Sequence, residues 1–450
     1  MQEKSSLNGE FQIIFLNHTL IDFSHPNSAK ANKPTLIVPD KDADGLSSGA
    51  ILRQTLILLG LDESLITIHL LRKNSTVHSH SESALMASHN PAYIFVLDQG
   101  SRNSPPLIPN PTTTSLVIDH HHAASETDFP ANSSHVTACN SPPVATASLL
   151  TYHICTPLHP SVLDLTAWLA VVGTHGDLGT TLKWQPPFPD MTQTFKTHKK
   201  GTLNAVVSLL NAPRRTPTYD VASAWDALTS PGAPSSILTN PRLLAAKEEV
   251  AAETVRWSRT APAFSADGKV AVFRINSGAQ IHPLIATRWA GSLKSNSLEF
   301  VMCANEGYAE GKVNFSCRVA KCAKGRSGDG EVDIIRGLKG YASLAPGVDG
   351  QGGEEGDGVE NKDVHSTSLL ERVGEDFARG HVQASGGIVG KKEFEELMGL
   401  MQVGVKKAAA KNEGGEKSGG ASGSSTKKGA GVIDSGQKNT LASYFGKAAS

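Results

Sequence analysis

The first part of the chain alternates between short apolar runs and longer segments whose apolar positions recur at helical spacing. From Pro34 to about Gly179 we expect strands at residues 35–38, 65–70, 93–97 and 116–118, and helices at 47–59, 81–87, 144–155 and 165–172. Strands that alternate with helices are typical of an α/β domain with a mainly parallel sheet. The pattern therefore predicts a doubly wound sheet over this region.

A second α/β unit follows a change in the pattern. Residues 185–200 are rich in Pro and Thr and are expected to form a loop. Helical spacing then dominates residues 201–263, which we interpret as a connector. The strands expected next lie at 269–275, 298–303 and 312–318, with helices at 282–292, 332–342, 366–378 and 392–401. We therefore divide the chain into an N-terminal extension (1–33), a first domain (34–200), the connector (201–263), a smaller domain with a mixed sheet (264–402) and a tail (403–450).

Composition narrows the function classes only a little. The net charge is −1, so the whole-chain balance gives no support for nucleic-acid binding. Five cysteines include no Cys-x-x-Cys pair, which indicates reduced thiols rather than a zinc site or a disulfide framework. No apolar run approaches the roughly 18 residues of a membrane span. Two Gly-rich stretches, 324–331 and 347–363, are expected to be surface insertions. The tail from 404 carries eight Lys against three acidic residues, and we expect a disordered basic segment.

The first candidate site is Asp40-Lys41-Asp42-Ala43-Asp44-Gly45, directly behind the first predicted strand. Ligands of open α/β sheets bind at the carboxyl ends of the strands. Three carboxylates this close repel one another unless cations neutralise them. A helix cap with a solvated turn is the alternative. A calcium loop is a weaker rival, because Ile51 stands where its twelfth-position Glu would be.

Three further acidic segments follow along the chain. Asp98 ends the apolar run of residues 94–97, Asp119-His120-His121 follows the run 115–118, and Asp177 follows Gly176 after an apolar helix. Each alone could be an ordinary polar turn. Together they offer carboxylate and imidazole ligands, which suit Mn²⁺ or Mg²⁺ better than structural zinc. Two such ions would clamp the attacking and leaving oxygens of a displacement at phosphorus.

These four motifs, in this order, resemble those of the DHH phosphoesterases. The resemblance implies that two Mn²⁺ ions, with Mg²⁺ as an alternative, are held by Asp42, Asp44, Asp98, His120 and Asp177. It also implies that Asp40 assists in metal binding and that His121 contacts metal or the scissile phosphate. Asp119, His120 and His121 are the expected catalytic triplet. Val38 stands where the pyrophosphatase branch usually has His, so the chain is more similar to the RecJ-like nuclease branch.

Residues 264–402 resemble the DHH-associated domain. Asn314–Arg318 is similar to the family's Ser-x-Arg strand, and Gly380–Gly387 to its Gly-His-x-x-Ala-x-Gly-Gly loop. Arg and Ser side chains and closely approaching backbone N–H groups are the donors that a phosphate needs. Residues 211–215 are similar to a further Asn-Ala-x-x-Arg stretch in which either Arg could serve; we assign Arg214. The expected substrate-binding residues are thus Ser316, Arg318, His381, Gly386, Gly387 and Arg214.

The tail ends in an apolar group similar to a motif that binds the replication sliding clamp. Leu441, Tyr444 and Phe445 have the spacing of its aliphatic and aromatic positions, while Lys438 replaces its usual Gln. A chance apolar patch is the alternative.

The sequence as a whole predicts a metal-dependent phosphodiesterase with its active site in the cleft between the two domains. The expected substrate is single-stranded nucleic acid or short oligonucleotides, cleaved by a nuclear, or else cytoplasmic, exonuclease of replication or repair. Two alternatives stay open. One is a hydrolase for small substrates such as short oligonucleotides, cyclic dinucleotides or polyphosphate, and the other is a non-catalytic replication scaffold.

Overall fold

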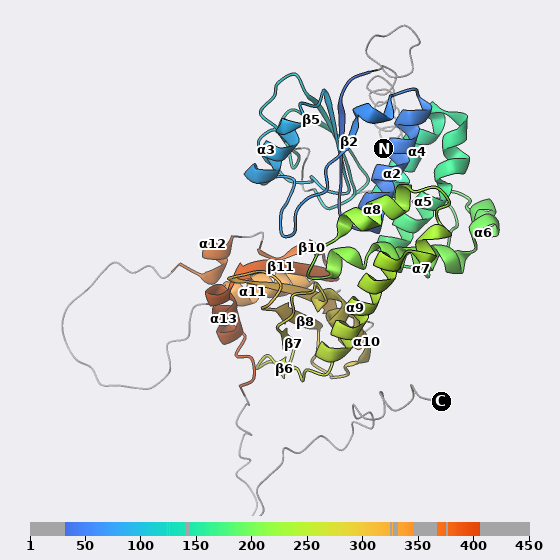
Figure 1. The fold of residues 1–450 in the computed structure, drawn as a ribbon. Helices are drawn as coiled ribbons and strands as arrows, with labels where there is room; N and C mark the ends of the chain where they lie inside the picture. The colour runs from blue at the N-terminus through green and yellow to red at the C-terminus, as the bar shows by residue number, and fades with distance from the viewer. Residues whose placement is uncertain are drawn as a thin grey trace, which may run out of the picture.

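Two β-sheets organise the protein, one in each of two lobes (Figure 1). The structure, a computed structural model, describes residues 32–123, 125, 127–139, 145–324, 326, 332–344, 367–374 and 377–405. The first sheet is wholly parallel, in the order β2-β1-β3-β4-β5. Its strands are β1 (Thr35–Pro39), β2 (Ile66–Ile68), β3 (Tyr93–Leu97), β4 (Thr114–Asp119) and β5 (Ser133–Thr137).

Helices cover both faces of this sheet, as the alternation of the sequence predicted. The alternate side chains of each strand enter two different cores: Ile37 and Phe95 lie in one, and Leu36 and Ile94 in the other. The first core is closed by α2 (Ala43–Leu58), α4 (Ala147–Cys155) and α5 (Pro160–Leu178), and the second by α3 (His80–Ser88). The strand β5 was not predicted, because its residues 133–135 are Ser, Ser and His.

The connector is helical and packs against the first sheet's helices. It contains α7 (Lys200–Leu210), the 3₁₀ turn η3 (Pro213–Arg215), α8 (Val221–Thr229), η4 (Ser236–Thr239) and α9 (Pro241–Trp257). Buried side chains of α7 and α8 share the core of α2. The domain division at residue 200 stays a prediction. The expected loop at 185–200 was wrong in part, because α6 (Thr192–His198) forms there with Asp190 accepting from the Thr192 amide.

The second sheet is mixed and has the order β10-β11-β9-β8-β7-β6. Its strands are β6 (Ala263–Phe264), β7 (Val270–Ile275), β8 (Phe300–Asn305), β9 (Lys312–Val319), β10 (Arg379–His381) and β11 (Ala384–Gly390). The helix α10 (His282–Ser292) packs on one face, where Trp289 stacks on Phe273. The helices α11 (Ile334–Ala342), α12 (Leu369–Val373) and α13 (Lys391–Leu400) complete this lobe, and β10 and β11 lie on its side nearest the first lobe (Figure 1).

Two predictions for this lobe were wrong. The helix expected at 366–378 is shorter: α12 ends at Val373, and β10 begins at Arg379. The glycines Gly386 and Gly387 lie on strand β11 rather than in a loop, paired with Ser316 and Phe315 of β9. A side chain at Gly387 would overlap the carbonyl oxygen of Phe377. These glycines therefore permit close packing at the sheet edge, which sequence composition does not distinguish from a turn.

No helix in the described part of the chain is long and apolar enough to cross a membrane. The N-terminal extension up to residue 31, most of both Gly-rich insertions and the tail from 406 lie outside the described residues. The expectations for Leu441, Tyr444 and Phe445 therefore stay predictions.

Candidate metal centre

The acidic residues of all four motifs meet at the carboxyl-terminal edge of the first sheet. Asp40 follows β1, Asp98 follows β3, Asp119 ends β4, and Asp177 lies in the last turn of α5. Parallel strands bring these ends to one edge, as the sequence predicted. Ligand atoms within 4.8 Å of one another form three overlapping groups: Asp98, His120 and His121; Asp44, Asp98, His120 and Asp177; and Asp40, Asp42 and Asp98.

Local backbone geometry positions the carboxylates of the first two motifs. The carboxylate of Asp42 caps α2 by accepting from the amides of Asp44 (3.1 Å) and Gly45 (3.3 Å). A side chain at Gly45 would come within 2.6 Å of the backbone oxygen of Asp40, so this glycine is needed for space rather than for an unusual φ. Asp98 has φ 62°, a left-handed conformation that is strained for a non-glycine residue. Such strain is common where a side chain must be aimed at a functional site.

Asp177 reaches the centre because α5 packs unusually close to α2 and α4. The sequence predicted that the helix ends at residue 172, but α5 continues to Leu178, and Asp177 is a helical residue. A side chain at Gly173 would approach within 2.7 Å of Oδ1 of Asp44, and one at Gly176 within 3.1 Å of Cβ of Ala43. These small residues let a helix carry a carboxylate into a crowded cluster, as predicted for the surroundings of Asp177.

Asp44 is fully buried and held by a second helix. Its Oδ2 accepts from the amide of Ala147 at 2.8 Å, and its Oδ1 accepts from the amide of Ser148 at 3.0 Å. Both amides belong to the first turn of α4, where the helix presents unpaired N–H groups and a positive dipole end. This partner, more than a hundred residues away in the chain, could not be seen in the sequence.

Crowding of carboxylates opposes ionisation of the deepest ones. Burial and the nearby Asp177 raise the pKa of Asp44 to about 7. Burial, Asp44 and Asp42 raise the pKa of Asp98 well above its ordinary value. Although burial raises it, the cations Arg214 and Lys41 lower the pKa of Asp42 to about 2. The cluster thus carries more negative charge than the protein's own cations neutralise, which is the electrostatic condition of a cation site.

His121 is oriented by Asp119. Its Nδ1 lies 2.7 Å from Oδ1 of Asp119, whose other oxygen accepts from the amide of Ser101 at 3.0 Å. Burial lowers the pKa of His121, but the hydrogen bond and the charge of Asp119 outweigh it and raise the pKa to about 9. In the metal-free protein the ring is therefore a cationic donor at neutral pH. Asp119 thus orients His121 through this hydrogen bond, and it is not a member of the three groups of ligand atoms.

The ligand atoms of His120, Asp98 and Asp177 have the spacing and the chemistry of a site for a divalent metal ion. Nε2 of His120 lies 2.9 Å from Oδ2 of Asp177 and 3.3 Å from Oδ1 of Asp98. Neither this nitrogen nor Oδ1 of Asp98 makes a hydrogen bond, although both are buried. Buried polar atoms are rarely left unpaired. Converging carboxylate oxygens and imidazole nitrogens match the donor set of Mn²⁺ or Mg²⁺.

The predicted Ser-x-Arg strand of the second lobe lies within electrostatic range of η3: besides burial, the charges of Arg214, Asp42 and Arg318 act on the pKa of Arg215. Arg318 Nη1 donates to Oγ of Ser316 at 2.9 Å, so the two side chains share one face of β9. On β11, Gly386 lies opposite Ser316 in the same sheet. His381 lies on β10, and its side chain is outside the described residues.

The two arginines of η3 have different environments. Arg214 is tied within the protein: it lies 3.5 Å from Oδ2 of Asp42 and donates to Asn211 and Gln280. Arg215 is also half-buried, and its Nη1 is buried without a hydrogen-bond partner. Nδ1 of His282, at the start of α10, is also buried without a partner, and Arg215 and Arg318 add to burial in lowering its pKa to about 3. His282 is a candidate substrate contact that was not predicted from the sequence, and Arg215 is the alternative that the Asn-Ala-x-x-Arg stretch left open beside Arg214.

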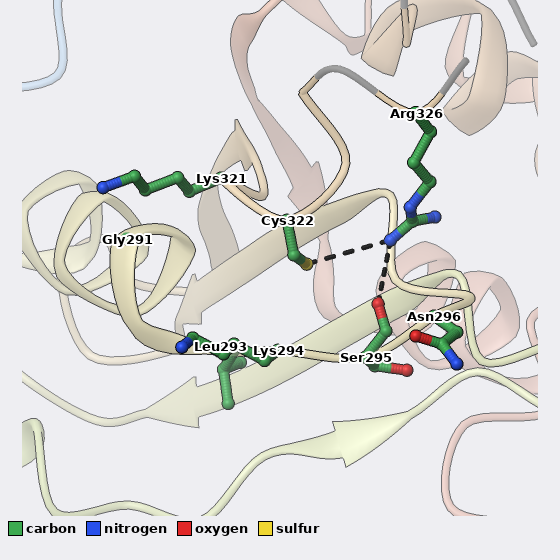
Figure 2. A pocket seen from close by; sticks show the side chains of 8 residues that line it. All are labelled: Gly291, Leu293, Lys294, Ser295, Asn296, Lys321, Cys322 and Arg326. Carbon is green, nitrogen blue, oxygen red and sulfur yellow. Dashed lines mark hydrogen bonds between the residues drawn. The ribbon is translucent and has the colours of Figure 1, made fainter.

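A separate cavity of about 890 Å³ lies at the far end of α10 (Figure 2). Figure 2 shows Lys294, Lys321 and Arg326 around it, with Arg326 donating to the backbone oxygen of Ser295 at 2.8 Å. None of its lining residues belongs to the metal cluster or to the Ser-x-Arg strand. We therefore do not identify this cavity with the reaction site.

The chain is similar to known proteins in its structure rather than in its sequence. No protein-family model matches the chain, and no curated protein sequence matches it. RecJ of Thermus thermophilus in complex with Mn²⁺ superposes with a TM-score of 0.55 at 15% identity, over 87% of this chain and 54% of that one. An exonuclease RecJ bound to manganese gives 0.54 at 16% identity, over 86% of this chain and 93% of that one.

A DHH domain described as a member of the s1p family of ribosomal proteins gives a TM-score of 0.57 at 12% identity, over 89% of this chain and 91% of that one. The chain has the fold of the DHH phosphoesterases. It spans about half the length of the Thermus RecJ chain. The DHH fold accounts for both sheets, and the four motifs of the sequence occupy the edge where the ligand groups converge.

Proposed function

We propose that this protein is a Mn²⁺-dependent phosphodiesterase that hydrolyses single-stranded nucleic acid from an end. The observation that carries the proposal is the set of carboxylate and imidazole ligand atoms that converge around His120 and Asp98, in a fold whose compared members include an exonuclease bound to manganese. A complete and buried donor set of this kind disfavours a purely structural scaffold, because uncompensated carboxylates destabilise the fold.

Residues of the cluster divide into metal-holding and substrate-facing groups. Asp42, Asp44, Asp98, His120 and Asp177 would hold two divalent ions, with Asp40 beside them. When bound, the ions supply a nucleophilic hydroxide at neutral pH and stabilise charge on the phosphate oxygens. The imidazolium of His121, held by Asp119, is placed to donate to a phosphate oxygen or to the departing oxygen.

Side chains on the second lobe would orient the phosphodiester. Arg318 and Ser316 offer a guanidinium and a hydroxyl on one face of β9. Arg215 and His282 add buried nitrogens without a hydrogen-bond partner, which would bind an anionic phosphate oxygen. Desolvated donors of this kind bind a phosphate more strongly than exposed ones, because water competes less.

The test is hydrolysis of end-labelled substrates by purified full-length protein with Mn²⁺. We expect stepwise shortening of single-stranded oligonucleotides and a loss of at least about a hundredfold in rate for Asp98→Asn. Thermal melting would check that the variant folds. Hydrolysis of dinucleotides, cyclic dinucleotides or polyphosphate in preference to oligonucleotides would replace the proposed substrate with a small one. Absence of turnover on every phosphoester would contradict the enzymatic proposal.

A further inference from the structure

The edge strand β10 places a cationic side chain on the substrate-facing side of the second sheet. Arg379 of β10 lies opposite Gly386 of β11, which lies opposite Ser316 of β9. Residues directly opposite one another across neighbouring strands project to the same face of a sheet. Arg379 therefore shares its face with Ser316 and Arg318. It is exposed, and it lies outside the motifs that the sequence analysis singled out.

The first lobe contributes a second arginine close to the catalytic triplet. The amide of Ser101 donates to Asp119 at 3.0 Å, which fixes the loop after β3 beside the Asp119–His121 pair. Arg102 follows directly and is exposed. Two residues further along this loop, Oγ of Ser104 bonds Nδ1 of His78 at 3.0 Å. The loop thus holds Arg102 at the rim of the metal centre, on the side of His121.

The imidazole of His78 is influenced by the charges of both arginines. Besides burial, the charges of Arg102 and Arg379 lower the pKa of His78 to about 4, and Asp119 acts in the opposite direction. Two guanidinium groups from different lobes therefore act electrostatically on one imidazole. His78 is neutral at pH 7, and the carboxylate nearest to it, Asp119, is already engaged by His121 and Ser101. Each lobe thus contributes one arginine to the surroundings of His78.

We propose that Arg102 and Arg379 form a two-lobed clamp on the phosphate backbone of a nucleic-acid strand, beyond the phosphodiester that is cleaved. Neighbouring strands lie about 4.8 Å apart, so β10 is roughly 10 Å from β9 and its Ser-x-Arg pair. A strand engaged at Arg318 must therefore extend past the scissile phosphate to reach Arg379. The clamp rests on the proposed function and makes it more specific: it selects polynucleotides over dinucleotides. Guanidinium groups suit this role, because they bind phosphate oxygens in a bidentate manner.

The experiment is a salt titration of binding, with full-length protein and a fluorescent single-stranded decanucleotide in Ca²⁺ instead of Mn²⁺. Each lost phosphate contact lowers the magnitude of the negative slope of log K against log salt by about 0.7 for single strands, and slope below means this magnitude. For Arg102→Gln/Arg379→Gln we expect the slope to fall by about 1.4, with affinity at least about tenfold weaker at low salt. In Mn²⁺, kcat/KM should fall more for the decanucleotide than for a dinucleotide.

Lys321→Gln is the matched control. It removes an exposed cation from the same lobe, at the cavity of Figure 2 rather than at the cleft. Its slope should equal that of the wild type, and the basic tail contributes equally to every variant. Lys321→Gln removes one charge and the double variant two, so a decrease in Lys321→Gln half as large as in the double variant, or larger, would show general charge attraction and overturn the clamp. So would an unchanged slope in the double variant, or equal competition by polyglutamate of matched charge, which would indicate an acidic protein partner.

Different experimental results would contradict the clamp and the proposed function. Oligonucleotide binding that depends on the two arginines, without turnover in Mn²⁺, would support the clamp and contradict the phosphodiesterase. Turnover that the double variant retains with unchanged selectivity for length would contradict the clamp alone.

Discussion

Asp44 carries the main electrostatic conflict of the site. It is buried, it accepts two amides of α4, and it lies beside Asp177 and Asp98. The sequence predicted the carboxylates, because an Asp behind an apolar strand marks the edge where parallel strands end. It could not predict the donors from α4, choose between Arg214 and Arg215, or reveal Arg379. Those contacts depend on how distant segments pack.

Titration of Asp44 should appear in the stability of the metal-free protein. Its folded pKa of about 7 lies above the unfolded value of 3.8, so its contribution is complete below about pH 4 and is lost as the pH rises through 7. Measured by urea unfolding, the free energy of wild type relative to Asp44→Asn should fall by roughly 1 kcal/mol from pH 6 to pH 8. Saturating Mn²⁺ should remove this dependence. A difference that is flat or rises with pH would contradict the assignment.

At the scale of elements, the strands of the first sheet were the most predictable part, because buried parallel strands are continuous apolar runs. Elements that carry polar residues or glycines, namely β5, β10 and β11, were missed or assigned to loops. The end of α5 was also placed too early, since Gly173 and Gly176 look like helix terminators. In the structure they are contact residues, where α5 approaches α2 and α4.

Gly173→Ala tests this close approach. The added methyl group would overlap the Ser148 side chain and crowd Asp44, so we expect destabilisation of about 1–3 kcal/mol together with weaker Mn²⁺ binding. Gly201→Ala in α7 is the control, because its Cβ would meet nothing within 4 Å, and it should leave stability unchanged or raise it by up to about 1 kcal/mol. Equal thermal midpoints for the two variants would show that α5 has room to move.

At the scale of the whole molecule, the two lobes meet through polar contacts around the cleft. Lys73 of the first lobe donates to the backbone oxygens of Pro217 and Gly278, both at 3.2 Å, and lies over the ring of Tyr308. The sequence predicted two α/β units and a cleft between them, but their contacts involve single polar residues with no periodic signal. The tail from residue 406 lies outside the described residues.

For the tail we propose binding to the replication sliding clamp and, with it, a nuclear role in replication or repair. Full-length protein with Tyr444→Ala/Phe445→Ala should lose binding in surface plasmon resonance, since the aromatic side chains would fill the clamp's pocket. Lys438→Gln, which restores the motif's usual residue, should bind more tightly than the wild type. The proposal fails if both variants bind as the wild type does.

The central claim is that the cluster around His120 and Asp98 is a metal centre that cleaves phosphodiesters. Its most direct test is the initial rate of hydrolysis of a labelled single-stranded oligonucleotide as Mn²⁺ is titrated into metal-free protein. We expect no cleavage without metal, a rate that rises with Mn²⁺ to saturation, and no such rise in Asp98→Asn. Cleavage that is independent of Mn²⁺, or that Asp98→Asn retains in full, would contradict it.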